Sequence, residues 1–139
     1  MSGRQTFTMI KPVAMGSNYT GAILKLINEA GFRLKAMKLT HLTKKQACDF
    51  YGIHAGKPFF EELTSFMSSG PIVAAILEKD NAVDDFRKLI GATDPARAEP
   101  GTIRKIFAES LSHNAIHGSD SDENAIVESD FFFSKMERF

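Results

Sequence analysis

The stretch Ile72-Val73-Ala74-Ala75-Ile76-Leu77 places six apolar side chains in a row, with no polar residue between them. A short apolar run of this kind is typical of a strand covered on both faces, because a half-exposed strand alternates apolar and polar residues. The turn residues Ser68-Ser69-Gly70-Pro71 come directly before it. The run therefore predicts a central strand of a sheet.

The segments on either side of this run predict a mixture of strands and helices. Strands are expected at residues 6–10, 32–39 and 115–117, and the first ends where Pro12 pushes Lys11 into an extended conformation. Helices are expected at residues 20–30, from Thr43 to about Gly52, at 58–67, from Asn81 to Gly91, at 103–107, and after a cap at Ser119 or Asp120. This order suits a ferredoxin-like α+β fold, a four-stranded antiparallel sheet with helices packed on one face.

The composition limits the classes of protein to which the chain can belong. Its 139 residues fit one domain, residues 1–139, and 43% of them are apolar, which is enough to bury a core. Lysine and arginine number 17 and so do aspartate and glutamate, so the basic surplus of a general nucleic-acid binder is missing. The single cysteine, Cys48, excludes an internal disulfide and a zinc site built from several cysteines.

Nothing in the sequence predicts a membrane partner. No apolar run approaches the roughly 18–20 residues that a membrane span needs. Residues 1–4 lead into the first strand without the apolar core of a signal peptide. We therefore expect a cytoplasmic protein.

The most unusual stretch is Asn114-Ala115-Ile116-His117-Gly118-Ser119-Asp120-Ser121. It puts a histidine at the end of a short strand, before a glycine and two residues that can cap the next helix. An imidazole that is partly deprotonated at neutral pH is a competent nucleophile. The spacing alone fits a structural histidine beside a capping turn better, because such caps are common. Both interpretations of His117 are open on this pattern.

Several residues outside this stretch could form an anion site. Lys11 lies at a strand end, Arg87 on a helix, and Arg104 just after a proline-glycine turn. Each of them, taken singly, is typical of a solvated surface charge. Thr93 could donate its hydroxyl to a phosphate or cap a turn. The aromatic residues that fit either a ligand contact or a core or interface position are Tyr51, Phe59 and Phe60.

The sequence matches none of the common nucleotide-binding or metal-binding motifs. Residues 52–58 resemble a phosphate-binding P-loop only weakly, because the glycines stand one residue too close and Pro58 replaces the required serine or threonine. No GxGxxG follows a strand, and the four histidines have neither HxH nor HExxH spacing. A metal ion held by protein side chains is therefore not expected.

Six segments share their order and spacing with one known family. They are Thr8-Met9-Ile10-Lys11-Pro12, Pro58-Phe59-Phe60, Ser69-Gly70-Pro71-Ile72-Val73-Ala74, Gly91-Ala92-Thr93-Asp94-Pro95, Pro100-Gly101-Thr102-Ile103-Arg104 and the histidine stretch 114–121. On these segments the chain resembles nucleoside diphosphate kinases from about Thr6 to the C-terminus. The pattern NxxHGSDS is highly specific for that family, and it favours His117 as a nucleophile.

The resemblance implies an enzyme that transfers the γ-phosphoryl group of a nucleoside triphosphate, typically ATP, to a nucleoside diphosphate through a phosphohistidine. His117 matches that histidine, Glu128 the carboxylate at its other ring nitrogen, and Ser119 a serine near both. Magnesium is implied as an ion carried by the nucleotide phosphates. Residues matching contacts to phosphates or sugar are Lys11, Tyr51, Arg87, Thr93, Arg104 and Asn114, and those matching the two sides of the base are Phe59 and Leu111.

The chain departs from the family pattern at a few positions. Val13 stands where the family usually has aspartate, which leaves the geometry of that loop open. Asp94 stands where asparagine is commoner and adds a negative charge beside a phosphate contact, unless it serves the turn. Lys57 replaces a common arginine, and His113 occupies a variable position. None of these changes removes a residue that phosphoryl transfer needs.

Two other functions are possible alternatives to a kinase on this sequence. An RNA-recognition module on the same fold would present aromatic residues on an open sheet face and carry a basic surplus. The strands offer Thr6, Thr8 and a buried apolar run instead. A catalytically silent family member is disfavoured because the nucleophile, its carboxylate and the phosphate-binding cations are all retained.

Two segments predict self-association. Phe131-Phe132-Phe133 lies close to the C-terminus, where alternation along an extended tail would turn at least one ring outward. The loop Ala98-Glu99-Pro100-Gly101 lacks a core of its own. Because the resemblance implies dimers assembled into larger oligomers, we expect a hexamer, with a tetramer as the second choice.

Overall fold

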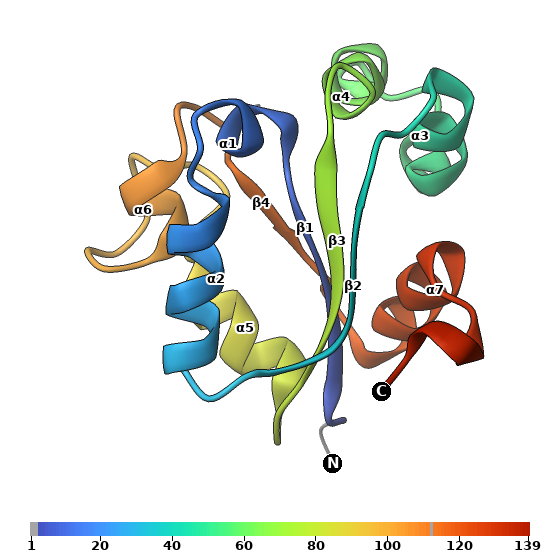
Figure 1. The fold of residues 1–139 in the computed structure, drawn as a ribbon. Coiled ribbons are helices and arrows are strands. Elements are labelled where there is room, and N and C mark those ends of the chain that lie inside the picture. Colours follow the sequence, from blue (N-terminus) through green and yellow to red (C-terminus); the bar gives the residue numbers. More distant parts are fainter. Residues whose placement is uncertain (1–2, 112) are drawn as a thin grey trace.

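The computed structural model describes residues 3–111 and 113–139, and an antiparallel sheet of four strands runs through its centre (Figure 1). The strands lie in the order β2-β3-β1-β4. Their bounds are β1 Gln5–Ile10, β2 Arg33–Thr40, β3 Ile72–Glu78 and β4 Ile116–Gly118. The apolar run at 72–77 is therefore an inner strand, as predicted, and the ferredoxin-like sheet is confirmed.

Helices cover both faces of this sheet, so the prediction of helices on one face is wrong. Ile72, Ala74 and Ile76 pack into one apolar cluster, while Val73, Ala75 and Leu77 pack into a second cluster on the opposite face. An inner strand that is apolar on both faces needs cover on both. The helices are α1 Pro12–Gly16, α2 Thr20–Glu29, α5 Ala82–Ile90 and α6 Ile103–Phe107 at one face, and α3 Lys44–Phe50, α4 Phe60–Met67 and α7 Asp122–Phe132 at the other (Figure 1).

The local signals for helix ends were right in one case and wrong in another. Thr43 begins α3 with a capping box, in which its hydroxyl accepts from the backbone N–H of Gln46. The cap of α7 is Ser121, whose hydroxyl accepts from the N–H of Asn124, and it is neither Ser119 nor Asp120. Ser119 is fully buried beneath the helix, so its hydroxyl is used by other partners.

The residue that follows β1 is extended, as predicted, but the chain then turns at once into α1. Lys11 has φ −79° and ψ 162°, and Pro12 occupies the first turn of α1. Proline suits that position because its missing N–H would have no partner there. The helix fixes where the Lys11 side chain leaves the sheet.

The C-terminal aromatic run is helical and not an extended tail. Phe131 and Phe132 form the last turn of α7, and Phe133 is its C-cap residue. Phe132 and Phe133 are buried, whereas Phe131 is 42% exposed. The expectation that at least one ring faces outward is confirmed, although helical geometry rather than strand alternation is the cause.

Two short 3₁₀ turns, Gly52–His54 and Lys135–Glu137, complete the described elements. In the part of the chain that the structure describes, no helix combines the length and the apolar character needed to cross a membrane.

Candidate active site

A cavity of about 700 Å³ lies where the end of β1 meets the beginning of β4. Every expected site residue except Ser119 lines it, although Lys11 and Glu128 come from opposite ends of the chain. The expected residues in its wall are Lys11, Tyr51, Phe59, Arg87, Thr93, Arg104, Leu111, Asn114, His117 and Glu128.

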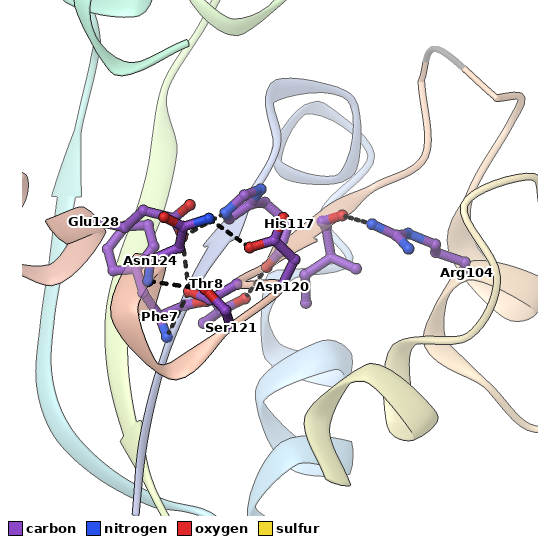
Figure 2. Close-up of polar contacts among 10 residues, drawn as sticks. Phe7, Thr8, Arg104, His117, Asp120, Ser121, Asn124 and Glu128 are labelled. Carbon is purple, nitrogen blue, oxygen red and sulfur yellow. Dashed lines mark hydrogen bonds and ion pairs between the residues drawn. The ribbon is translucent and has the colours of Figure 1, made fainter. Parts of the chain in front are cut away.

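His117 is held by a carboxylate at one ring nitrogen. Figure 2 shows Glu128 of α7 turned toward the ring, and its Oε1 lies 2.9 Å from Nε2 of His117. The hydroxyl of Ser119 donates to the same Oε1 at 2.7 Å. A carboxylate only accepts, so Nε2 carries the proton and Nδ1 keeps its lone pair. Ser119 therefore orients Glu128 from behind, while Glu128 fixes the tautomer of the histidine.

The backbone and neighbouring rings leave the His117 imidazole little freedom. Residue 117 pairs with Met9 of β1, and the hydroxyl of Thr8 donates to the His117 carbonyl at 2.8 Å (Figure 2). The ring of Phe50 meets the imidazole edge-on with centroids 5.7 Å apart, and Tyr51 does so at 6.4 Å. The side chain is only 18% exposed, so the imidazole is held in a rigid and largely dry wall of the cavity.

Gly118 lets the strand that carries His117 lie against α5. A Cβ at position 118 would stand 2.9 Å from Cδ1 of Ile90 and 3.0 Å from Cδ2 of Phe86. Real Cβ contacts are essentially never that short, so a side chain here would displace the core beside the site. Packing against α5 therefore explains the glycine that follows His117 in the HGSDS pattern.

Lys11 is a buried cation at the wall of the cavity. Its Nζ donates to Oδ1 of Asn114 at 2.7 Å, and the Asn114 amide reaches the carbonyl of Thr93 at 3.4 Å. Burial, and to a lesser extent the positive charge of Arg104, lowers the pKa of Lys11 to about 7. With the side chain 6% exposed, Lys11 is poised to gain its full charge when an anion arrives.

Arg104 is positioned by the close approach of two helix ends. It donates to the carbonyls of Gly91 and Ile116, at 3.0 and 2.9 Å. Gly91 has φ +88°, and a Cβ there would lie 2.5 Å from the hydroxyl of Thr102, the residue that caps α6. Burial, with a smaller contribution from Arg87, lowers the pKa of Arg104 to about 10. The guanidinium still carries its charge at neutral pH and faces the cavity from a fixed base.

Arg87 and Thr93 complete the polar wall from exposed positions. Asp94, whose charge could have opposed a phosphate, uses its carboxylate to accept from the backbone N–H of Ala96 at 3.0 Å. It is not among the described residues that line the cavity. Asp94, which differs from the family pattern, therefore stabilises the turn.

Tyr51 is a buried phenol whose hydroxyl has no hydrogen-bond partner among residues 3–111 and 113–139. Burial raises its pKa, and the negative charge of Glu128 raises it further. The hydroxyl therefore keeps its proton at every physiological pH. It can donate to a ligand in the cavity.

The outer end of the cavity is apolar. Phe59, 47% exposed, and Leu111, 58% exposed, both line it. The ring of His54 meets Phe59 edge-on with centroids 5.2 Å apart, and Nζ of Lys57 lies 6.0 Å from the Phe59 ring. A flat aromatic face at the mouth of a cationic pocket suits a nucleobase.

The cavity wall also contains polar residues that sequence reasoning did not assign to the site, among them His54, Asp120 and Asn124. The Asn124 amide donates to Oδ1 of Asp120 at 2.6 Å (Figure 2). Their spacing of four residues at a helix start could have indicated this pair. The three-residue step from Tyr51 to His54 could similarly have placed both rings on one side of a helical turn.

The cavity suits phosphate better than a bare metal ion. Within the described residues, no group of three or more His, Cys, Asp or Glu side chains could hold a metal. Lys11, Arg87 and Arg104 would repel an unaccompanied cation, whereas they would attract an anion that carries one.

Known proteins resemble this chain along its whole length. A family model described as nucleoside diphosphate kinase matches residues 4–138. The nucleoside diphosphate kinase of Flavobacterium psychrophilum is 58% identical over 139 residues, 100% of both chains. That of Aquifex aeolicus superposes with a TM-score of 0.96 at 41% identity, covering 99% of this chain and 100% of that one. The Halobacterium salinarum enzyme, solved in complex with CDP, superposes with a TM-score of 0.94 at 35% identity, covering 99% and 91%.

Proposed function

The chain belongs to the nucleoside diphosphate kinase family, and we propose that Nδ1 of His117 carries the phosphoryl group that it transfers. The enzyme moves the γ-phosphoryl group of a nucleoside triphosphate to a nucleoside diphosphate in a ping-pong reaction. The observation that carries the assignment is the bond between Glu128 and Nε2, which leaves Nδ1 with its lone pair beside the cavity. A sheet covered on both faces also disfavours an RNA-recognition module, which needs an open face.

In the first half-reaction, Nδ1 attacks the γ-phosphorus. The bond from phosphorus to the bridging oxygen breaks, and that oxygen leaves with the electron pair on the nucleoside diphosphate. Glu128 stabilises the positive charge that spreads over the imidazole, as the orienting acid does in catalytic triads. The second half-reaction is the reverse, with the terminal oxygen of another diphosphate attacking the phosphohistidine.

We assign the remaining polar residues to positioning and to charge stabilisation. Phosphoryl transfer needs little covalent help from a protein, so donors aimed at the transferring oxygens supply most of the rate. Lys11 and Arg104 offer fixed charged donors, and Arg87 offers an adjustable one. Neutral donors to the phosphates and sugar are Tyr51, Thr93 and Asn114. Ser119 acts through Glu128.

We propose that magnesium enters with the substrate, bound to the nucleotide phosphates. The cationic wall made by Lys11, Arg87 and Arg104 supports this assignment. The ion would neutralise phosphate charge while it keeps several water ligands, as magnesium usually does.

The direct test follows the phosphoryl group in two steps. The enzyme is incubated with ATP labelled in its γ-phosphate, freed of nucleotide, and then mixed with GDP. We expect an acid-labile, base-stable phosphoenzyme and its quantitative discharge to GTP. Transfer that requires both nucleotides at once, with no phosphoenzyme, would contradict the proposal.

Base recognition should be broad, because a stacking platform accepts any π-face. Phe59→Ala is expected to weaken nucleotide binding by about 1–3 kcal/mol, by a similar amount for purines and pyrimidines. Dissociation constants for ADP, GDP, CDP and UDP measure this, with Phe139→Ala, an exposed ring that does not line the cavity, as the control. Loss of affinity for one base alone would indicate hydrogen-bond readout of a base edge.

Nucleotide binding should take up protons above neutral pH. Lys11 has a pKa of about 7 in the free protein, so it is largely neutral at pH 8.5, and bound phosphates raise that pKa by attraction. We expect uptake approaching one proton per ADP at pH 8.5 and little at pH 6, where Lys11 is already charged. Calorimetry in buffers of different ionisation enthalpy measures the uptake. Equal values in the wild type and in Lys11→Met would assign the proton elsewhere.

We propose that the enzyme works as a homo-oligomer, a hexamer first and a tetramer second. The exposed ring of Phe131 supports this, as do Met37 and Leu39, which are exposed on the edge strand β2. The exposed Pro100-Gly101 turn supports a further contact. Light scattering at micromolar protein should give six times the mass of one chain. An active monomer would contradict the assignment.

We further propose that residues 1–139 act as a single domain in the cytoplasm. The family match over residues 4–138 supports the first assignment. The free thiol of Cys48 suits a reducing compartment and supports the second.

A further inference from the structure

A second cleft lies next to the cationic wall of the nucleotide cavity. Its volume is about 540 Å³, and it shares Arg87, Ile90, Thr93 and Arg104 with the cavity that contains His117. We call this second space the outer cleft. The residues that line only the outer cleft are Lys88, Gly91, Ala92, Arg97, Glu99 and Thr102.

The outer cleft is strongly cationic for its size. Two exposed basic residues, Lys88 and Arg97, are added to the two arginines that it shares with the nucleotide cavity, against one carboxylate, Glu99. The charges of Lys88 and Arg97 form no ion pair with any residue of 3–111 or 113–139. A single-sign field in a cleft concentrates anions there.

The shape of the two spaces restricts the ligand that could occupy both. The base platform at Phe59 lines the nucleotide cavity only, and none of the described residues that line the outer cleft is aromatic. A ligand that runs from His117 past Arg87 into the outer cleft would meet cations along its length and no second stacking surface. A linear chain of phosphates has that chemistry.

We propose that the outer cleft binds the inner phosphates of inorganic polyphosphate, whose terminal phosphoryl group is transferred to His117. The inference rests on the proposed function, because it uses the same nucleophile. Polyphosphate would enter as an alternative donor to the nucleoside triphosphate, and a nucleoside diphosphate would discharge the enzyme.

The step balances without another reactant. Nδ1 of His117 forms a bond to the terminal phosphorus, and the bond from that phosphorus to the first bridging oxygen breaks. The electron pair leaves with this oxygen on a chain that is one phosphate shorter. The proton stays on Nε2, which keeps its hydrogen bond to Glu128. The shared cations Arg87 and Arg104 would stabilise the leaving chain.

The first test asks whether polyphosphate phosphorylates the enzyme in the absence of nucleotide. Wild-type protein is incubated with ³²P-labelled chains of about 15 phosphates, with γ-labelled ATP in parallel, and GDP is then added. We expect acid-labile label on His117 from both donors and labelled GTP from both phosphoenzymes. Label from ATP alone overturns the polyphosphate proposal and leaves the proposed function intact. Label from neither donor overturns both.

The second test assigns the outer cleft. In the double variant Lys88→Ala with Arg97→Ala, we expect about tenfold weaker binding of the long chain, roughly threefold for each exposed contact. The affinity for ATP and for tripolyphosphate, which is too short to fill both spaces, should change less than twofold. The matched control removes two exposed charges that line neither space, Lys25→Ala with Lys135→Ala.

Salt dependence gives an independent readout. The logarithm of long-chain affinity falls as the logarithm of salt concentration rises. This slope should be less steep by about 1.4 in the outer-cleft variant, if each of the two lost contacts contributes about 0.7, as in single-stranded polyanions. Equal affinities and slopes for the outer-cleft variant and the control variant would overturn the assignment.

Discussion

Replacing His117 with alanine is expected to lower kcat by at least about 10⁴-fold, because the variant has no atom on which to hold the phosphoryl group. The fold should survive, since the side chain is anchored mainly through Glu128 and the strand pairing is made by the backbone. Steady-state transfer from ATP to GDP measures the loss. The same variant should form no acid-labile phosphoenzyme.

The other histidines provide the controls for this prediction. Nε2 of His41 donates to the carbonyl of Ser68, and His113 packs against Phe66 in a tilted arrangement with centroids 4.3 Å apart. Neither histidine lines the cavity. His54 lines the cavity beside Phe59 and bears on base binding. Alanine at each of these three positions should leave the phosphohistidine in place. Full turnover in His117→Gln would show that the nucleophile is another residue.

Lys11→Met is expected to lower kcat/KM by about 10²–10³-fold, the usual loss when one preorganised donor to a developing charge is removed. Methionine keeps a similar length in a buried position, so the change removes the ammonium group and little packing. Single-turnover phosphorylation by ATP should slow as much as steady-state turnover. A loss of less than threefold in kcat/KM would show that Lys11 does not stabilise the transition state.

Although Lys11→Met should lose activity, it should gain stability relative to the wild type as the pH falls. Folding lowers the pKa of Lys11 from 10.5 to about 7, so the unfolded chain binds the proton more tightly between these values. The Lys11 contribution to the free energy of unfolding therefore falls as the pH drops from about 10.5 to 7. Thermal unfolding across this range should show Lys11→Met gaining on the wild type as the pH falls, whereas Lys25→Met, an exposed control, should not. Parallel curves for all three proteins would contradict the low pKa.

The apolar run at 72–77 predicts the layering of the fold better than the order of the elements does. Its lack of alternation predicted a strand covered on both faces, while the element order suggested helices on one face only. The burial of Ile72 and of Val73 on opposite faces agrees with the first argument. A local hydrophobic pattern reflects the burial of each side chain directly, whereas the order of elements does not show how many faces of a sheet are covered.

The N-terminal cap of α7 could not be predicted from local sequence alone. Ser119, Asp120 and Ser121 all have side chains that can cap a helix, so their identities could not choose among them. Ser121 became the cap because Ser119 is committed to Glu128 and to the backbone of Phe7. Those partners lie on α7 and β1, and no sequence window contains all three.

By itself, the sequence predicted the strands, most helices, the family and a set of candidate site residues, because periodicity, capping and the NxxHGSDS pattern are local properties. The tertiary structure alone decided that Nε2 of His117 meets Glu128, that the pKa of Lys11 falls to about 7, and that Lys88 and Arg97 line a cleft together with Arg87 and Arg104. Each of these depends on distances between segments far apart in the chain and on the solvent that packing excludes. A hydrogen bond or a pKa shift is set by that environment, which no stretch of neighbouring residues encodes.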